Sequence, residues 1–125
     1  MTFENNTVCN IIPAGVEEIN CFYNYKIIIN EIVKPDEIYS IYGNIIYDLQ
    51  KFENIELLTY NICSEKDFYD LTNFKKLTYL TVIIFCDISD FTIKINNNVS
   101  VGFNSKKLYK IVEDNEQGIV KFIKS

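Results

Sequence analysis

The chain has 125 residues, 48% of them hydrophobic and 23% charged, which predicts a single folded domain over residues 1–125 and excludes a disordered chain. Twelve lysines and seventeen carboxylates give a net charge of −5, so we expect no nucleic-acid partner, because such surfaces need clustered positive charge. Histidine, arginine and tryptophan are absent, which removes most of the usual groups for acid–base catalysis, metal binding and phosphate binding.

The N-terminal part of the chain is expected to form strands. Residues 7–12 and 21–33 are strand-like, and the turn-forming segment 13–15 separates them. The first residues lack the basic start and apolar run of a secretory signal, and no apolar run approaches the ~20 residues that span a bilayer. The four cysteines, Cys9, Cys21, Cys63 and Cys86, each lie in an apolar or strand-like stretch, so we expect them to be reduced, in a cytoplasmic protein without a membrane partner. No C-x-x-C pair occurs, which argues against a zinc site.

Two helices are expected in the middle of the chain. Pro35 and the two acids after it are typical of a helix start, since proline fits the first turn and acids complement the helix dipole. Apolar residues, Tyr42 among them, then recur at helical spacing and predict a helix over 35–52. Ser64 and Asp67 are spaced like a capping box and predict the start of a second helix.

A repeat of 22 residues relates these two segments. Six positions match at this offset: Asp48 and Asp70, Leu49 and Leu71, Phe52 and Phe74, Ile55 and Leu77, Leu58 and Leu80, Thr59 and Thr81. In each unit, apolar residues three apart are followed by residues that alternate in twos, which predicts a helix, a turn and a short strand. Successive strands should be parallel neighbours, and their residues facing the helices should be Leu58, Tyr60, Leu80 and Val82.

The repeated positions resemble the leucine-rich repeat, in which spaced leucines are followed by an asparagine or cysteine. The first unit supplies Leu49, Phe52, Ile55, Leu58, Tyr60 and Cys63. The second supplies Leu71, Phe74, Leu77, Leu80 and Val82, but it departs after the strand, where Phe85 takes the place of the asparagine or cysteine. The resemblance implies an α/β fold: a short solenoid of helix–strand units with a repeat-like core over about 35–88 and helices packed on one side of the sheet.

The C-terminal part of the chain is expected to complete this sheet. Residues 91–95 and 99–103 alternate on either side of three asparagines and predict a hairpin. Residues 105–114 predict a short amphipathic helix, and residues 118–123 predict a strand. Because two repeats are too few for a stable solenoid, the flanking strands and the hairpin would have to supply the missing neighbours.

The sequence lacks the patterns typical of an enzyme. Its paired carboxylates are adjacent along the chain and are interpreted as solvated surface, because hydrolases need acids that converge across a cleft. Without histidine, a nucleophile such as Cys86 or Ser89 would have only a lysine or a carboxylate as its base. Asp87 and Asp90 lack the spacing of a calcium loop. We therefore expect no enzymatic activity, no cofactor and no metal site.

The side of the predicted sheet that faces away from the helices is the candidate binding surface. The repeat places three pairs side by side there: Leu57 and Tyr79, Thr59 and Thr81, Asn61 and Ile83. Such a half-apolar face is either covered by the chain's own ends or open to a protein partner. The candidate partner-binding residues, neighbouring acids included, are Glu56, Leu57, Thr59, Asn61, Tyr79, Thr81, Ile83, Asp87 and Asp90.

The chain also resembles the small, acidic immunity proteins of bacterial toxin–immunity systems, and its excess of isoleucine, asparagine, lysine and tyrosine is typical of an AT-rich genome. This resemblance implies a non-catalytic inhibitor, monomeric or in a 1:1 heterodimer, that binds a basic cognate toxin such as a nuclease. Its carboxylates would pair with lysine or arginine of the toxin. The alternative is an interaction or scaffold domain of the leucine-rich-repeat type with another protein partner.

Overall fold

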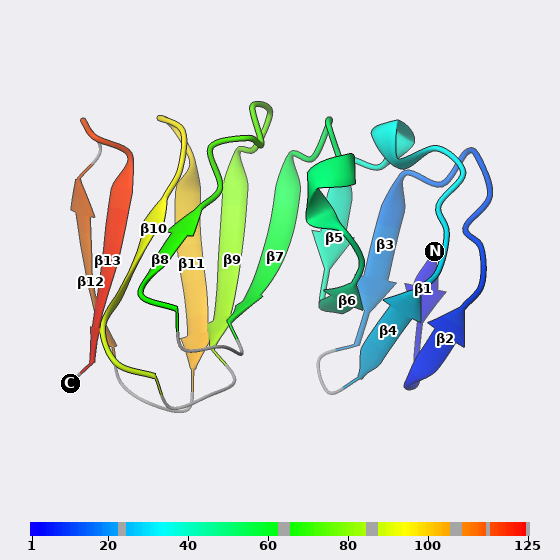
Figure 1. The fold of residues 1–125 in the computed structure, drawn as a ribbon, viewed down its shortest axis with the longest axis horizontal. Coiled ribbons are helices and arrows are strands. Elements are labelled where there is room, and N and C mark those ends of the chain that lie inside the picture. The colour runs from blue at the N-terminus through cyan, green and yellow to red at the C-terminus, as the bar shows by residue number, and fades with distance from the viewer. Residues whose placement is uncertain (23–24, 63–65, 85–87, 106–108, 115, 125) are drawn as a thin grey trace.

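The computed structural model describes residues 1–22, 25–62, 66–84, 88–105, 109–114 and 116–124, which form two layers of β-strands (Figure 1). One layer is a six-stranded parallel sheet, here the long sheet, with strands in the order β1 (Thr2–Phe3), β3 (Glu18–Cys21), β5 (Ser40–Tyr42), β7 (Leu57–Ile62), β9 (Tyr79–Ile84) and β11 (Ser100–Ser105). The termini lie at opposite ends of the long axis (Figure 1).

The second layer consists of two smaller sheets. The N-terminal sheet is parallel and contains β2 (Thr7–Cys9), β4 (Lys26–Ile29) and β6 (Asn44–Ile46). The C-terminal sheet has the order β12 (Tyr109–Asp114), β13 (Ile119–Lys124), β10 (Phe91–Lys94) and β8 (Phe68–Asp70), and β13 runs antiparallel to both of its neighbours. Along most of the chain, strands of the long sheet alternate with strands of the second layer, so the backbone winds in coils as in a β-solenoid.

The expected α/β fold is wrong, because the described residues contain no α-helix. The segment predicted as a helix over 35–52 instead holds two 3₁₀ turns, η1 (Pro35–Glu37) and η2 (Leu49–Lys51), together with β5 and β6. Asp67 directly precedes a strand, β8, and Ser64 lies outside the described residues. None of the described helical segments is long and apolar enough to cross a membrane.

Tight turns explain why the spacing resembled that of a helix. The amide of Phe74 donates to the carbonyl of Leu71, and the amide of Leu77 donates to the carbonyl of Phe74, each at 3.3 Å. Turns closed over three residues bring apolar side chains three apart to the same side of the chain, as a helix does. All three side chains are buried at this corner between the layers, so the helical units implied by the leucine-rich repeat are replaced by corners and a second strand.

The strand pairing predicted from the repeat is confirmed. Strands β7 and β9 are parallel neighbours with an offset of 22 residues, and the register pairs Leu57 with Tyr79, Thr59 with Thr81 and Asn61 with Ile83. Of the residues expected to face inward, Leu58, Leu80 and Val82 are buried and Tyr60 is half-buried against the core. The units therefore stack as predicted, although each unit contains tight turns and a second strand where a helix was expected.

The C-terminal predictions are partly wrong. Residues 91–103 do not form a hairpin, because β10 belongs to the C-terminal sheet and β11 to the long sheet. The helix expected over 105–114 is replaced by strand β12, whose Tyr109 is buried and whose Ile111 packs against the core. The strand expected over 118–123 is confirmed as β13.

The core lies between the layers and changes character along the molecule. Toward the N-terminus it is built mainly from isoleucines, and toward the C-terminus from aromatic rings. Phe91 and Phe122 stack with ring centroids 4.6 Å apart. The buried hydroxyl of Tyr109 donates to the carbonyl of Ile88 at 2.7 Å, which satisfies the polar group that comes with this ring.

Gly43, between β5 and β6, should be intolerant of substitution. It has a φ of +100°, and a Cβ built on it would collide with the carbonyl of Cys21 in the preceding coil. We expect Gly43→Ala to lower the free energy of unfolding by about 1 kcal/mol through backbone strain and by a further 1–3 kcal/mol, roughly, through the collision.

Urea denaturation checks this prediction, with Gly15→Ala as the matched control. Gly15 also has a positive φ, +89°, but a Cβ there would meet nothing within 4 Å. The control should therefore lose only the strain component, and equal losses in the two variants would contradict a close approach between coils.

Candidate functional site

The outer face of the long sheet carries a row of large exposed side chains. Leu57 on β7 and Tyr79 on β9 are register partners with exposed fractions of 41% and 44%. Tyr42 on β5 is 47% exposed, and it lies beside Thr59 because the preceding residue, Ile41, pairs with Leu58. Parallel in-register pairing therefore places apolar and aromatic groups from three successive coils on one side of the sheet.

The other predicted residues of this face lie deeper. Thr59 is 4% exposed and Ile83 is 5% exposed, whereas Thr81 and Asn61 are half-buried. The side-chain amide of Asn61 donates to the carbonyl of Gly43 at 3.1 Å and so links β7 to the preceding coil. The structure thus brings the six predicted face residues together, but Leu57 and Tyr79 provide the exposed surface.

Tyr79 lies across the neighbouring strand. A Cβ built on Gly102 of β11 would come within 2.6 Å of the Tyr79 hydroxyl oxygen, although the register partner of Tyr79 is Ser100. The ring therefore extends along the sheet over the glycine. Gly102 lets the aromatic ring lie against the backbone, so part of the ring is packed while the rest faces solvent.

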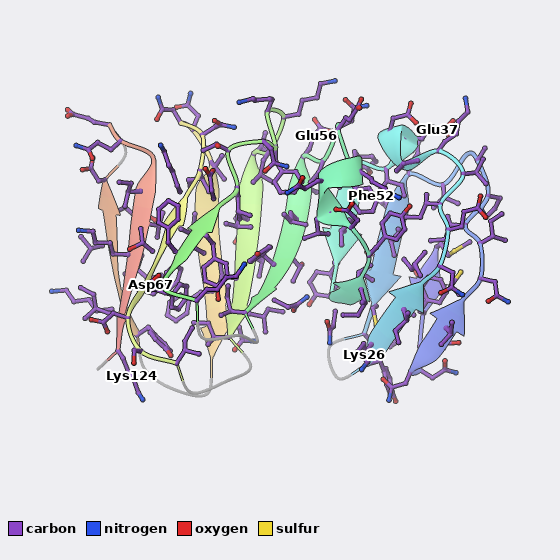
Figure 2. All side chains as sticks on the ribbon, in the orientation of Figure 1. Lys26, Glu37, Phe52, Glu56, Asp67 and Lys124 are labelled. Atoms are coloured by element: carbon purple, nitrogen blue, oxygen red, sulfur yellow. The ribbon has the colours of Figure 1, made fainter. Side chains whose placement is uncertain are left out.

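An acidic rim borders this face where the strands of the long sheet begin. Backbone hydrogen bonds stack one residue per coil: the amide of Tyr39 donates to the Glu17 carbonyl, and the amide of Glu56 donates to the Tyr39 carbonyl. Glu18 is the first residue of β3, one position after Glu17. Glu56 and Glu37 lie at the end of the coils opposite Lys26 (Figure 2). We define the acidic rim as Glu17, Glu18, Glu37 and Glu56.

Tyr39 connects two coils within the acidic rim. Its hydroxyl donates to Oε1 of Glu18 at 2.6 Å, and this hydrogen bond, reinforced by the negative charge of Glu18, raises the pKa of the Tyr39 phenol. A hollow of ≈390 Å³ lies beside the pair, lined by Met1, Gly15, Val16, Glu17, Glu18 and Tyr39. The carboxylates of the acidic rim are hydrogen-bond acceptors of the kind that bind a cationic group, and the Tyr39 hydroxyl donates to one of them.

The two predicted acids Asp87 and Asp90 are not among the described residues of the outer face. Asp90 belongs to the second layer, where its Oδ1 accepts a hydrogen bond from the backbone amide of Lys124 at 2.9 Å. Asp87 lies outside the described residues. Sequence reasoning missed Tyr42, Glu17 and Glu18, because Tyr42 was assigned to a helix and the strand containing Glu18 was not placed in the sheet. The alternation of Glu18, Ile19, Asn20 and Cys21 is the signal that could have found this strand.

The described residues contain little reactive chemistry. No group of three or more cysteine, aspartate or glutamate side chains among them is arranged to hold a metal ion. Cys9 and Cys21 are free thiols, and burial raises the pKa of Cys21, which disfavours the nucleophilic thiolate. Cys63 and Cys86 lie outside the described residues.

No protein-family model matches the chain, and no curated protein or solved structure matches it significantly.

The Tyr39–Glu18 contact should be visible in a pH titration. Because the folded state raises the phenol pKa, the stabilisation that it contributes is fully present below the ordinary tyrosine pKa and is lost as pH rises through the raised value. We expect Glu18→Gln to lower the Tyr39 pKa, as measured by the ¹³Cζ chemical shift of labelled tyrosine.

Glu17→Gln is the matched control for this titration, because Glu17 acts on Tyr39 through charge without a hydrogen bond to it. It should lower the pKa by less than Glu18→Gln does. Equal shifts from the two variants would mean that the hydrogen bond has no specific effect.

Proposed function

We propose that this protein is a non-catalytic inhibitor, an immunity protein, that binds a basic cognate toxin such as a nuclease in the bacterial cytoplasm. The observation that carries the proposal is the juxtaposition of Leu57 and Tyr79, both exposed and adjacent in register, with the acidic rim. Isolated exposed apolar side chains are ordinary on protein surfaces, whereas a contiguous group beside one sign of charge is typical of a binding site.

The excess of negative charge lies in the N-terminal half of the chain, which contains the acidic rim, as binding of a basic partner requires. Residues 1–62 contain nine carboxylates and three lysines, whereas residues 63–125 contain eight carboxylates and nine lysines. Within the described residues, one ion pair neutralises a rim carboxylate: Lys34 lies 3.9 Å from Glu37. An excess of negative charge attracts a basic partner and accelerates its association.

The mechanism would be occlusion. Tyr79, Tyr42 and Leu57 would lose water against an apolar part of the toxin and supply most of the affinity, since aromatic residues dominate binding energy at interfaces. Carboxylates of the rim would pair with lysine or arginine side chains that the toxin uses to hold a phosphate-containing substrate. The bound inhibitor would then cover that surface without chemical change.

Binding to a defined partner tests the proposal. The partner to be used is the purified product of the reading frame next to this gene, and calorimetry measures its affinity. We expect a dissociation constant below 1 µM, on the order of other specific complexes, and a loss of about 30-fold or more for Leu57→Lys, because a charge would enter the dry centre of the interface.

Phe68→Lys is the matched control, because Phe68 is 49% exposed on β8 in the other layer. It should leave the affinity unchanged. Equal losses of affinity in the two variants would contradict an interface on the long sheet. Binding without protection of cells that express the partner would instead support the scaffold alternative.

A further inference from the structure

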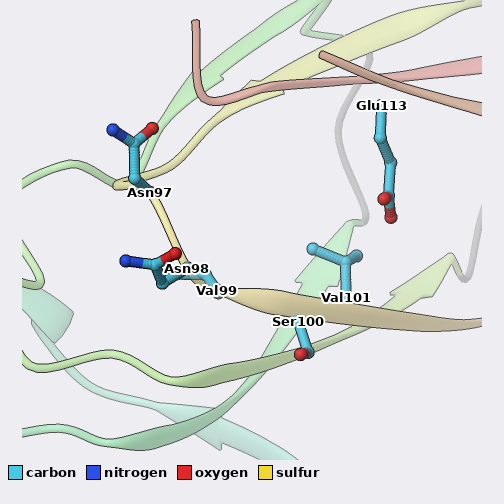
Figure 3. A pocket seen from close by; sticks show the side chains of 6 residues that line it. All are labelled: Asn97, Asn98, Val99, Ser100, Val101 and Glu113. Carbon is cyan, nitrogen blue, oxygen red and sulfur yellow. The ribbon is translucent and has the colours of Figure 1, made fainter. Parts of the chain in front are cut away.

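The C-terminal end of the long sheet has an open edge beside a hollow. Strand β11 is the last strand of the sheet, and in the described part of the chain it pairs with β9 alone. A hollow of ≈720 Å³ lies between β11 and β12, the edge strand of the C-terminal sheet, and is lined by Asn97, Asn98, Val99, Ser100, Val101 and Glu113 (Figure 3). The layers remain in contact beside it, because the rings of Phe103 on β11 and Phe122 on β13 lie with their centroids 5.9 Å apart.

The backbone of β11 has hydrogen-bonding groups directed toward this opening. The amide of Ser100 donates to the carbonyl of Thr78, which precedes β9. In a parallel ladder, alternate residues bond to one neighbour, so the amides and carbonyls of Val101 and Phe103 point away from β9, toward the free edge. These groups can pair with an added strand.

The open edge of β11 differs from the other end of the sheet and from ordinary edge strands. Edge strands are commonly protected by being short or by carrying charged residues or proline. At the N-terminal end, β1 has two residues. By contrast, β11 has six residues, Ser-Val-Gly-Phe-Asn-Ser, without a charge or a proline. A long uncharged edge of this kind is suited to β-strand addition.

Glu113 gives the hollow a charge. It pairs with Val120, a buried residue of β13, so its side chain lies on the core side of β12. Figure 3 shows the side chains of Glu113 and Val101 directed toward one another across the hollow. Glu113 is exposed and has no ion-pair partner among the described residues. An occupant of the hollow would therefore place an apolar group near Val101 and a cation near Glu113.

We propose that the β11 edge binds an extended segment of a partner protein as an additional strand, with a lysine or arginine side chain directed toward Glu113. The backbone of Val101 and Phe103 would supply the main-chain hydrogen bonds, and the hollow would supply the preference for the basic side chain. A second copy of this chain fits less well, since its own β11 strand has no cation to offer Glu113. The site lies at the edge and on the core side of β11, whereas Leu57 lies on the outer face of β7, two strands away.

A peptide of defined sequence tests this proposal. The probe is a heptapeptide of alternating threonine and valine whose central valine is replaced by lysine, so that the lysine and both valines share one face of an extended strand. We expect its addition to shift the ¹⁵N–¹H resonances of Val101 and Phe103. The same peptide with every backbone amide N-methylated should not bind, because it has no backbone donor left on either edge to complete the ladder.

Charge recognition is tested with an isosteric pair of variants. Glu113→Gln should weaken binding of the lysine peptide by about fivefold, the size expected for a partly exposed ion pair. Glu116→Gln changes the net charge equally, at an exposed position in the turn before β13, and should leave binding unchanged. Leu57→Lys should also leave it unchanged, which distinguishes failure of this proposal from failure of the proposed function.

Three results would overturn the proposal. One is the absence of shifts at Val101 and Phe103 at millimolar peptide. Another is equal binding by the peptide that carries glutamate in place of lysine. The third is association of the free protein through β11, seen as a mass that increases with protein concentration and as broadening of the same two resonances without peptide.

Discussion

The parallel backbone ladder of the long sheet is the constraint on which the rest of the structure depends. Each coil must bring its strand back to within about 4.8 Å of the previous one, at the same height, and register partners are separated by 17 to 22 residues along the chain. Asparagine side chains help to hold this spacing. The amide of Asn54 donates to the Asp36 carbonyl, and that of Asn96 donates to the carbonyls of Thr72 and Phe74, each in the preceding coil.

The same register creates the candidate binding face. Because side chains at one position of successive strands stack above each other, Leu57 and Tyr79 become neighbours although 22 residues separate them. The acidic rim arises in the same way, since the residues that precede successive strands stack at the end of the sheet where those strands begin. A binding surface on such a fold is therefore a property of several coils at once, and no single segment of sequence contains it.

The sequence allowed the stacking to be predicted but not the content of each unit. The offset of 22 residues and the inward alternation of Leu58 and Leu80 are local patterns, and both are reproduced in the structure. The helices were wrong because Leu71, Phe74 and Leu77 have a spacing that a helix and a pair of successive tight turns share. The spacing alone does not distinguish a helix from two successive tight turns, because the conformation adopted depends on the second layer that covers these residues. Exposure within the face was equally unpredictable: Thr59 is buried among its neighbours on the sheet.

The change from isoleucines to aromatic rings along the core has a consequence for local opening. In a coiled architecture each unit contacts mainly the next one, so stability is transmitted through nearest neighbours. The first coil begins with the two-residue strand β1, and the ammonium of Met1, just before it, donates to the Glu18 carbonyl. The last coils are joined by stacked rings and antiparallel pairing. Amide hydrogen exchange should therefore slow progressively from the first coil toward β9, so that the molecule frays from one end and retains a folded remnant at the other.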